Sequence, residues 1–215
     1  MRISARKFFI ILWITFAGLL VSAVAGVILS LFFKQTQFLI LRAVNSNKPP
    51  EYKIEKYLEF IEMYPDYKAS RMKVAAFYLT EYYRWRENLS PEEEKYIDKA
   101  IDQYRQGLLI DPRDTEALSM LSNIYRREDD LKKALFLDKR IVELEPLDAS
   151  YRVRLANSFW LNRQVHNAQA QARAALACDE KNTDARLVLA HTLELEGKLP
   201  EALRECRKAL ILLPD

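Results

Sequence analysis

Histidine, cysteine and glycine are scarce in this chain, and each scarcity excludes a class of functional site. The 215 residues include two histidines, two cysteines and four glycines. His166 and His191 begin no His-Glu-x-x-His metal motif, and Cys178 and Cys206 do not have metal-ligand spacing. The sequence contains neither a Walker phosphate loop nor a Gly-x-Ser-x-Gly nucleophile elbow. It therefore predicts no enzyme activity, no metal and no cofactor.

Acidic residues are absent from residues 1–50, so the formal net charge of +3 is unevenly spread. That segment holds six of the 33 basic residues, which leaves 27 basic against 30 acidic residues in the rest of the chain. A mildly acidic domain argues against general nucleic-acid binding. The six basic residues instead flank an apolar run, and they are Arg2, Arg6, Lys7, Lys34, Arg42 and Lys48.

The apolar run, residues 8–33, contains no charged side chain. As a helix rising ~1.5 Å per residue it is about 39 Å long, enough to cross a ~30 Å hydrocarbon core with some tilt. We interpret it as an uncleaved signal-anchor. The alternative is a signal peptide cleaved after residues 23–25, but the apolar run continues through residues 26–33.

The two ends of the apolar run carry almost the same number of basic residues, so charge alone does not set the orientation in the membrane. The lengths of the two flanking segments decide it instead. A short cationic N-terminus is hard to translocate, whereas a long domain translocates largely regardless of its charge. We therefore expect a cytoplasmic N-terminus and, in a bacterium, a single-pass inner-membrane protein with its larger domain in the periplasm.

Small residues recur every four positions within the run, at Gly18, Ser22, Gly26 and Ser30. This spacing lets a partner transmembrane helix approach closely. The alternative is that glycine and serine are simply common in membrane helices.

A 34-residue period organises the chain from Thr115 onward. Small residues at relative positions 8 and 20 let two helices approach, and larger apolar residues at 4, 7 and 11 fill the seam between repeats. Asp114, Asp148 and Asn182, also 34 residues apart, stand where helix N-caps belong. The slots are occupied by Leu118, Leu121, Ser122, Tyr125, Ala134 and Pro146, then by Leu155, Ala156, Phe159, Ala168 and Ala175, then by Arg186, Leu189, Ala190, Leu193, Ala202 and Pro214.

This pattern resembles the tetratricopeptide repeat (TPR) family, with departures at Asp138 and Cys206 in position 24 and at Glu180 in a proline position. The resemblance implies an all-α solenoid of about four helix–turn–helix repeats. With the apolar run, the expected fold is all-α, an N-terminal transmembrane helix followed by this solenoid. We expect a cytoplasmic tip and signal-anchor in residues 1–46, a linker in 47–52 and the solenoid in 53–215. Within the solenoid we expect a degenerate half repeat (53–67), a repeat with an insertion (68–114) and three regular repeats (115–148, 149–182 and 183–215).

Both cysteines fall on the predicted second helices of adjacent repeats. We expect Cys178 and Cys206 to be buried small apolar residues, and a disulfide between them is the alternative.

The resemblance also implies a concave groove lined by first-helix positions 2, 5, 9, 12 and 13. Trp160 there is either an anchor for a bound partner or a packing residue against the adjacent helix. The family's carboxylate clamp is not expected, because Met72 and Ala76 occupy the positions of its lysine and asparagine. The predicted partner-binding residues are Asn123, Arg126, Arg127, Asn157, Trp160, Leu161 and His191.

The last predicted helix is strongly apolar, and no polar capping helix follows it. We therefore expect Leu210 and Leu213 to contribute to an interface.

Together these features predict a non-enzymatic, membrane-tethered TPR scaffold that binds a protein partner and helps to assemble or stabilise a larger membrane or envelope complex. The alternatives are a structural subunit of a membrane enzyme complex and a secretion or assembly chaperone that holds client segments. The expected contacts are a protein, the lipid bilayer through residues 8–33 and a partner transmembrane helix, but no nucleic acid. The sequence does not name the partner, the pathway or the oligomeric state.

Overall fold

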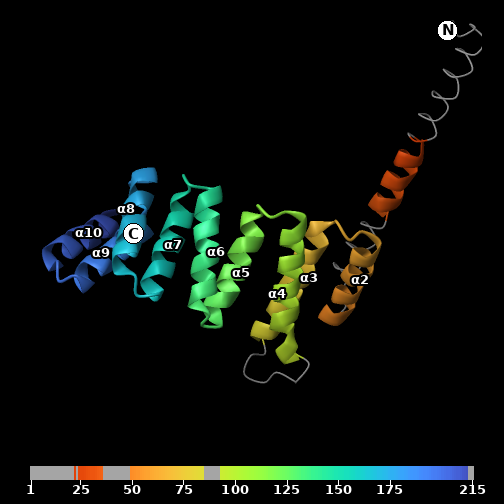
Figure 1. Ribbon diagram of the computed structural model, residues 1–215, viewed down its shortest axis with the longest axis horizontal. Coiled ribbons are helices and arrows are strands. Elements are labelled where there is room, and N and C mark those ends of the chain that lie inside the picture. Colours follow the sequence, from red (N-terminus) through yellow and green to blue (C-terminus); the bar gives the residue numbers. More distant parts are fainter. Residues whose placement is uncertain (1–21, 23, 36–48, 85–92, 213–215) are drawn as a thin grey trace, which may run out of the picture. The chain divides into compact units, whose positions relative to one another are not determined.

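The computed structural model describes residue 22 and residues 24–35, 49–84 and 93–212, and all of its secondary structure in these ranges is helical (Figure 1). The chain divides into two compact units, Met1–Ser70 and Arg71–Asp215. The expectation of an all-α protein is confirmed for the described ranges.

In the C-terminal unit the helices from residue 96 onward pack in chain order, each against the next along the row (Figure 1). The last six helices form three pairs whose bounds repeat every 34 residues, as the sequence period requires. The elements are α3 (Lys68–Arg84), which runs across the division between the units, η1 (Glu93–Lys95), α4 (Tyr96–Ile110), α5 (Thr115–Arg127), α6 (Leu131–Leu144), α7 (Ala149–Leu161), α8 (Val165–Cys178), α9 (Thr183–Leu195) and α10 (Leu199–Leu212).

The three predicted N-caps are confirmed. The Asp114 carboxylate accepts a hydrogen bond from the Ala117 amide at 3.0 Å, and the Asn182 side chain accepts one from the Ala185 amide at 2.9 Å. Asp148 accepts from two amides at the start of α7. These bonds satisfy amides that a helix leaves unpaired at its first turn, so each first helix starts at a defined residue.

Within each regular repeat, small side chains at positions 8 and 20 let the two helices touch. The Ser122 hydroxyl oxygen lies 3.3 Å from the Ala134 carbonyl oxygen, so α5 contacts α6 directly at this point. Ala156 and Ala168 are fully buried at the same two positions of the next repeat. The larger residues at positions 7 and 11 are also buried, namely Leu121, Tyr125, Leu155, Phe159, Leu189 and Leu193.

In its described part, the N-terminal unit contains α2 (Pro50–Met63) and helical residues 24–35. α2 starts inside the predicted linker, with proline at its first turn, where the missing amide hydrogen costs nothing. Tyr57 and Phe60 of α2 are buried.

Among the described residues, no helix has both the length and the apolar character needed to cross a membrane. Most of the predicted span, Gly18 included, lies outside the described residues. Ser22, Gly26 and Ser30 lie inside them and are exposed.

Candidate functional site

The predicted groove residues lie on α5, α7 and α9, the first helices of the three regular repeats. A pocket of about 500 Å³ opens beside α7, and it brings Arg126, Asn157, Trp160 and Leu161 together. Arg126 reaches this pocket from α5, so the pocket spans two repeats. Its remaining lining residues are Ser150, Tyr151, Val153 and Arg154.

Trp160 connects α7 to α9. Its ring meets the His191 ring nearly edge-on, with centroids 4.9 Å apart and planes at 66°. The indole also packs against a buried cluster that includes Leu135 and Phe159. Trp160 therefore lines the pocket and also packs in the seam between repeats. The sequence offered these as alternatives, an exposed anchor or a packing residue, and in the structure the side chain does both.

Two further pockets lie along the same helices. One, of about 470 Å³, lies between α3 and α5 and contains the predicted residues Asn123 and Arg127. The Arg127 guanidinium there lies 4.7 Å from the centre of the Tyr83 ring, a cation–π geometry. The other, of about 500 Å³, lies between α9 and α10 and contains His191. The seven predicted residues thus distribute over three neighbouring pockets rather than forming one site.

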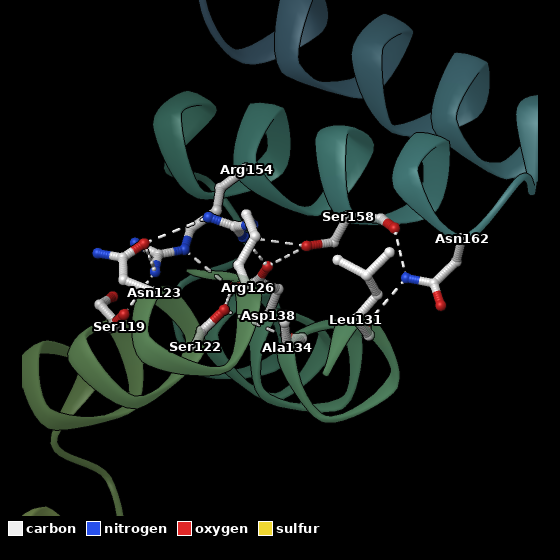
Figure 2. Close-up of polar contacts among 10 residues, drawn as sticks. All are labelled: Ser119, Ser122, Asn123, Arg126, Leu131, Ala134, Asp138, Arg154, Ser158 and Asn162. Carbon is white, nitrogen blue, oxygen red and sulfur yellow. Dashed lines mark hydrogen bonds and ion pairs between the residues drawn. The ribbon is translucent and has the colours of Figure 1, made fainter. Parts of the chain in front are cut away.

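A buried carboxylate in α6 binds side chains of both α5 and α7 (Figure 2). Asp138 is fully buried and accepts hydrogen bonds from Ser122 Oγ at 2.6 Å, Arg126 Nη2 at 2.6 Å and Arg154 Nε at 2.8 Å. The Ser158 hydroxyl also donates to it. Asp138 is therefore the centre of a polar cluster between two repeats, which explains why an acid replaces the large apolar residue usual at position 24.

The same cluster changes the role expected for Asn123. Its side-chain oxygen accepts hydrogen bonds from Arg126 Nη1 at 3.2 Å and Arg154 Nη2 at 2.8 Å (Figure 2). Asn157, one repeat later, is exposed beside Trp160. The two amides are equivalent in sequence, but Asn123 holds the arginines in place and Asn157 faces the open pocket.

The charges in this region do not balance, because two guanidinium groups share one carboxylate. Arg126 and Arg154 keep side-chain exposures of 25% and 19%, while Asp138 has 0%. Burial lowers the pKa of Arg126, Asp138 opposes that shift, and the nearby charge of Arg154 adds to it. The wall between α5 and α7 is therefore basic.

Sequence reasoning missed Arg154 and Ser158. The signal was present, because an acid at a core position needs a cation or hydroxyl partner. In a stacked array that partner comes from the next repeat. Which position on the next first helix reaches the acid depends on the packing of the two repeats.

The expectation for the cysteines is wrong. Cys178 and Cys206 are both exposed, and both are free thiols. Cys178 is the last residue of α8. Cys206 occupies the same repeat position as Asp138 and lines the pocket between α9 and α10.

No protein-family model matches the sequence, and no curated protein matches it. Solved structures do resemble it. A MamA structure is 15% identical over 83% of this chain and 92% of its own, with a TM-score of 0.65. A MamA fragment from Desulfovibrio magneticus RS-1 is 13% identical over 83% and 93%, also with a TM-score of 0.65. YrrB, described as a TPR protein with an unusual peptide-binding site, is 19% identical over 77% and 79%, with a TM-score of 0.61. These likenesses show a TPR-type α-solenoid fold.

Proposed function

We propose that this TPR-type chain is a non-enzymatic, membrane-tethered scaffold that binds a protein partner and helps to assemble or stabilise a larger membrane or envelope complex. The pocket beside α7 carries the proposal. It combines a half-buried indole with an exposed amide and two guanidinium groups, a mixture typical of protein-binding surfaces. The peptide-binding site named for YrrB supports the same use of this fold.

The partner segment that suits this surface runs across the first helices. Trp160 offers an apolar contact, Asn157 offers hydrogen bonds to a peptide backbone, and Arg126 with Arg127 favours an acidic flank. Because Arg126 is held by Asp138, it presents its charge from a fixed position, which lowers the ordering cost of binding.

Membrane tethering rests on the charge-free residues 8–33 and their basic flanks. We propose a single-pass protein, in a bacterium one of the inner membrane with its repeats in the periplasm. An alkaline-phosphatase fusion at the C-terminus is expected to be active in cells. An inactive fusion beside an active cytoplasmic reporter at the same site would reverse the proposed orientation.

The experiment that tests partner binding compares the full chain with two variants. Affinity purification in mild detergent, followed by mass spectrometry, identifies the partner. Trp160→Ala is expected to weaken its binding at least ~10-fold, because truncating a central aromatic anchor costs about 2 kcal/mol or more. Phe136→Ala is the matched control, since Phe136 is a 66% exposed aromatic residue on α6, outside the three pockets.

Stability must be measured on the same variants, because Trp160 also packs against α9. Trp160→Ala is expected to lower the thermal midpoint as well, so binding is compared at a temperature where all variants are folded. Full partner binding by folded Trp160→Ala would overturn the proposal. A stoichiometric partner would favour a subunit of a membrane complex, and exchangeable clients would favour a chaperone.

A further inference from the structure

Four aromatic rings meet in the N-terminal unit, where the helix over residues 24–35 contacts α2 and the turn after it. The Phe33 ring centroid lies 5.7 Å from that of Phe60, 5.0 Å from that of Tyr64 and 5.3 Å from that of Tyr67. Phe60 in turn lies 4.7 Å from Tyr64 and 5.4 Å from Tyr67. Phe33 meets both tyrosines edge-on, at 88° and 78°, a favoured geometry for aromatic pairs. We call these four residues the aromatic cluster.

Apart from Ser30, the residues of the stretch 24–35 that precede Phe33 in the same helix are apolar or glycine. Residues 24–32 are all exposed. Nine consecutive helical residues go round the helix axis more than twice, so every side of the helix is exposed and not one stripe alone. The large side chains among them are between 52% and 70% exposed, and they are Val24, Val27, Ile28, Leu29, Leu31 and Phe32.

This all-round exposure identifies the medium that covers the helix. A protein partner would cover one side, as the seams of the solenoid do, whereas lipid surrounds a helix completely. The helix also belongs to the charge-free run of residues 8–33. Lipid is therefore the occupant that fits residues 24–32.

The aromatic cluster stands at the end of that run. Lys34, directly after Phe33, is the first charged residue beyond it. Tyrosines and lysines are enriched where a membrane helix leaves the hydrocarbon, because their polar ends reach the headgroups. Residues 24–33 span about 14 Å, roughly half of a ~30 Å hydrocarbon core. With Phe33 at the interface, residue 24 lies near the bilayer midplane.

We propose that the aromatic cluster lies at the membrane–water interface and fixes the orientation of α2 relative to the membrane helix, with lipid as the partner of residues 24–33. The proposal rests on the proposed membrane tether. Phe60 is held in place within the cluster, because it is 1% exposed and cannot move without disturbing α2. Phe33 then holds the membrane helix to it, so α2 is held at the bilayer surface in one orientation.

The test is a distance measurement on the full chain in phosphatidylcholine nanodiscs. The exposed Cys178 and Cys206 are replaced by serine, and spin labels are placed at Ala25→Cys and Glu62→Cys, both exposed positions. Double electron–electron resonance is expected to give one narrow distribution of distances between the two spin labels. The same measurement on Phe33→Ala is expected to give a broad distribution. Leu31→Ala is expected to keep the narrow distribution, because Leu31 is 60% exposed on the same helix and lies outside the aromatic cluster.

A flotation assay with phosphatidylcholine vesicles first shows whether the unsubstituted chain binds lipid, so that the distance measurements can be interpreted. A broad distribution in the unsubstituted chain that floats would overturn the aromatic cluster as the fixing device. A narrow distribution in Phe33→Ala, or equal broadening in Leu31→Ala, would do the same. Failure of the unsubstituted chain to float would instead overturn the membrane tether on which the proposal rests.

Discussion

Within each regular repeat, the turn between the two helices contains one residue in the left-handed backbone conformation, and among the described residues only one of these three is glycine. Asp129, Arg163 and Gly197 have φ values of 62°, 60° and 74° and stand 34 residues apart. In each turn the next amide bonds back to the first helix, as Gln164 does to the Phe159 carbonyl at 2.9 Å. The conformation is imposed by the turn, so it strains a residue that has a Cβ.

Exchanging the residue types at these turns should change stability in opposite directions. Arg163→Gly is expected to raise the free energy of unfolding by about 1 kcal/mol, because the Arg163 side chain is exposed and only backbone strain is removed. Gly197→Ala is expected to lower it by about 1 kcal/mol, since an added Cβ meets no atom within 4 Å and the loss is conformational. Urea unfolding measures both. Stabilisation by both variants, or by neither, would contradict this account.

Tyr104 occupies position 24 of the repeat that contains the insertion, and burial raises its pKa to about 12. An unfolded tyrosine ionises near pH 10. Between about pH 10 and 12 the unfolded chain releases a proton that the native chain keeps, so stability is present below pH 10 and falls as the pH rises.

Tyr104→Phe should therefore reduce the alkaline loss of stability. The loss that Tyr104 itself causes is on the order of 2 kcal/mol between pH 10 and 12. Phenylalanine keeps the buried ring and removes only the hydroxyl group, so the variant should fold. The thermal midpoints of both proteins are measured at several pH values between about 9 and 12. If the midpoint falls with pH equally steeply in both, the prediction is refuted. Some loss of stability with rising pH should remain in Tyr104→Phe, because burial also raises the pKa of Tyr78.

At the scale of the helices, the seam between the first two regular repeats is polar at its centre. α6 contributes Asp138, α5 contributes Arg126 and α7 contributes Arg154 (Figure 2). The Asn162 side chain adds a bond from the end of α7 to the Leu131 carbonyl of α6 at 3.0 Å. Such contacts specify which helix faces which, whereas a purely apolar seam would tolerate sliding.

Neutralising the central acid should weaken this seam strongly. Asp138→Asn is expected to lower the free energy of unfolding by roughly 3–5 kcal/mol, because it leaves two guanidinium groups without a counter-charge. Glu143→Gln is the matched control, since Glu143 is exposed on the same helix, and it is expected to change stability by less than about 0.5 kcal/mol. Equal effects in urea unfolding would show that the ion cluster contributes nothing beyond surface charge.

Arginine occupies position 4, where an apolar residue is expected, in the last two repeats, and it finds a carbonyl partner in the same way both times. Arg152 Nε donates to the Pro146 carbonyl at 2.8 Å, and Arg186 Nη2 donates to the Glu180 carbonyl at 2.6 Å. Arg186 also pairs with Glu205 of α10 at 2.9 Å. The periodic pattern located these slots, but an arginine there gives no local sign of its partners, because they come from the preceding loop and the second helix.

For the whole molecule, the predicted C-terminal interface remains a proposal that the described residues support in part. Leu213 lies outside them, while Leu210 is 69% exposed. Other large apolar side chains on α9 and α10 are also exposed, namely Leu187, Leu195, Leu199 and Leu203. Apolar surface that extends over two helices usually marks an interface.

Charging this surface should release a partner without unfolding the repeats. Leu203→Glu with Leu210→Glu is expected to abolish retention of a partner in affinity purification, while circular dichroism stays unchanged because both side chains are exposed. Leu147→Glu is the control, as Leu147 is 82% exposed in the loop after α6. Full retention by the double variant would show that this face binds nothing.

The sequence alone determined the repeat length, the pairing of the helices, their N-caps and the small residues at their contacts. Each of these depends on residues close together in one repeat, and the repetition makes a weak local signal readable. The tertiary structure alone decided that Asp138 takes Arg154 as a partner, that Trp160 meets His191 and that both cysteines are exposed. These features depend on how far one repeat is rotated against the next, because that rotation selects which side chains can reach across the seam.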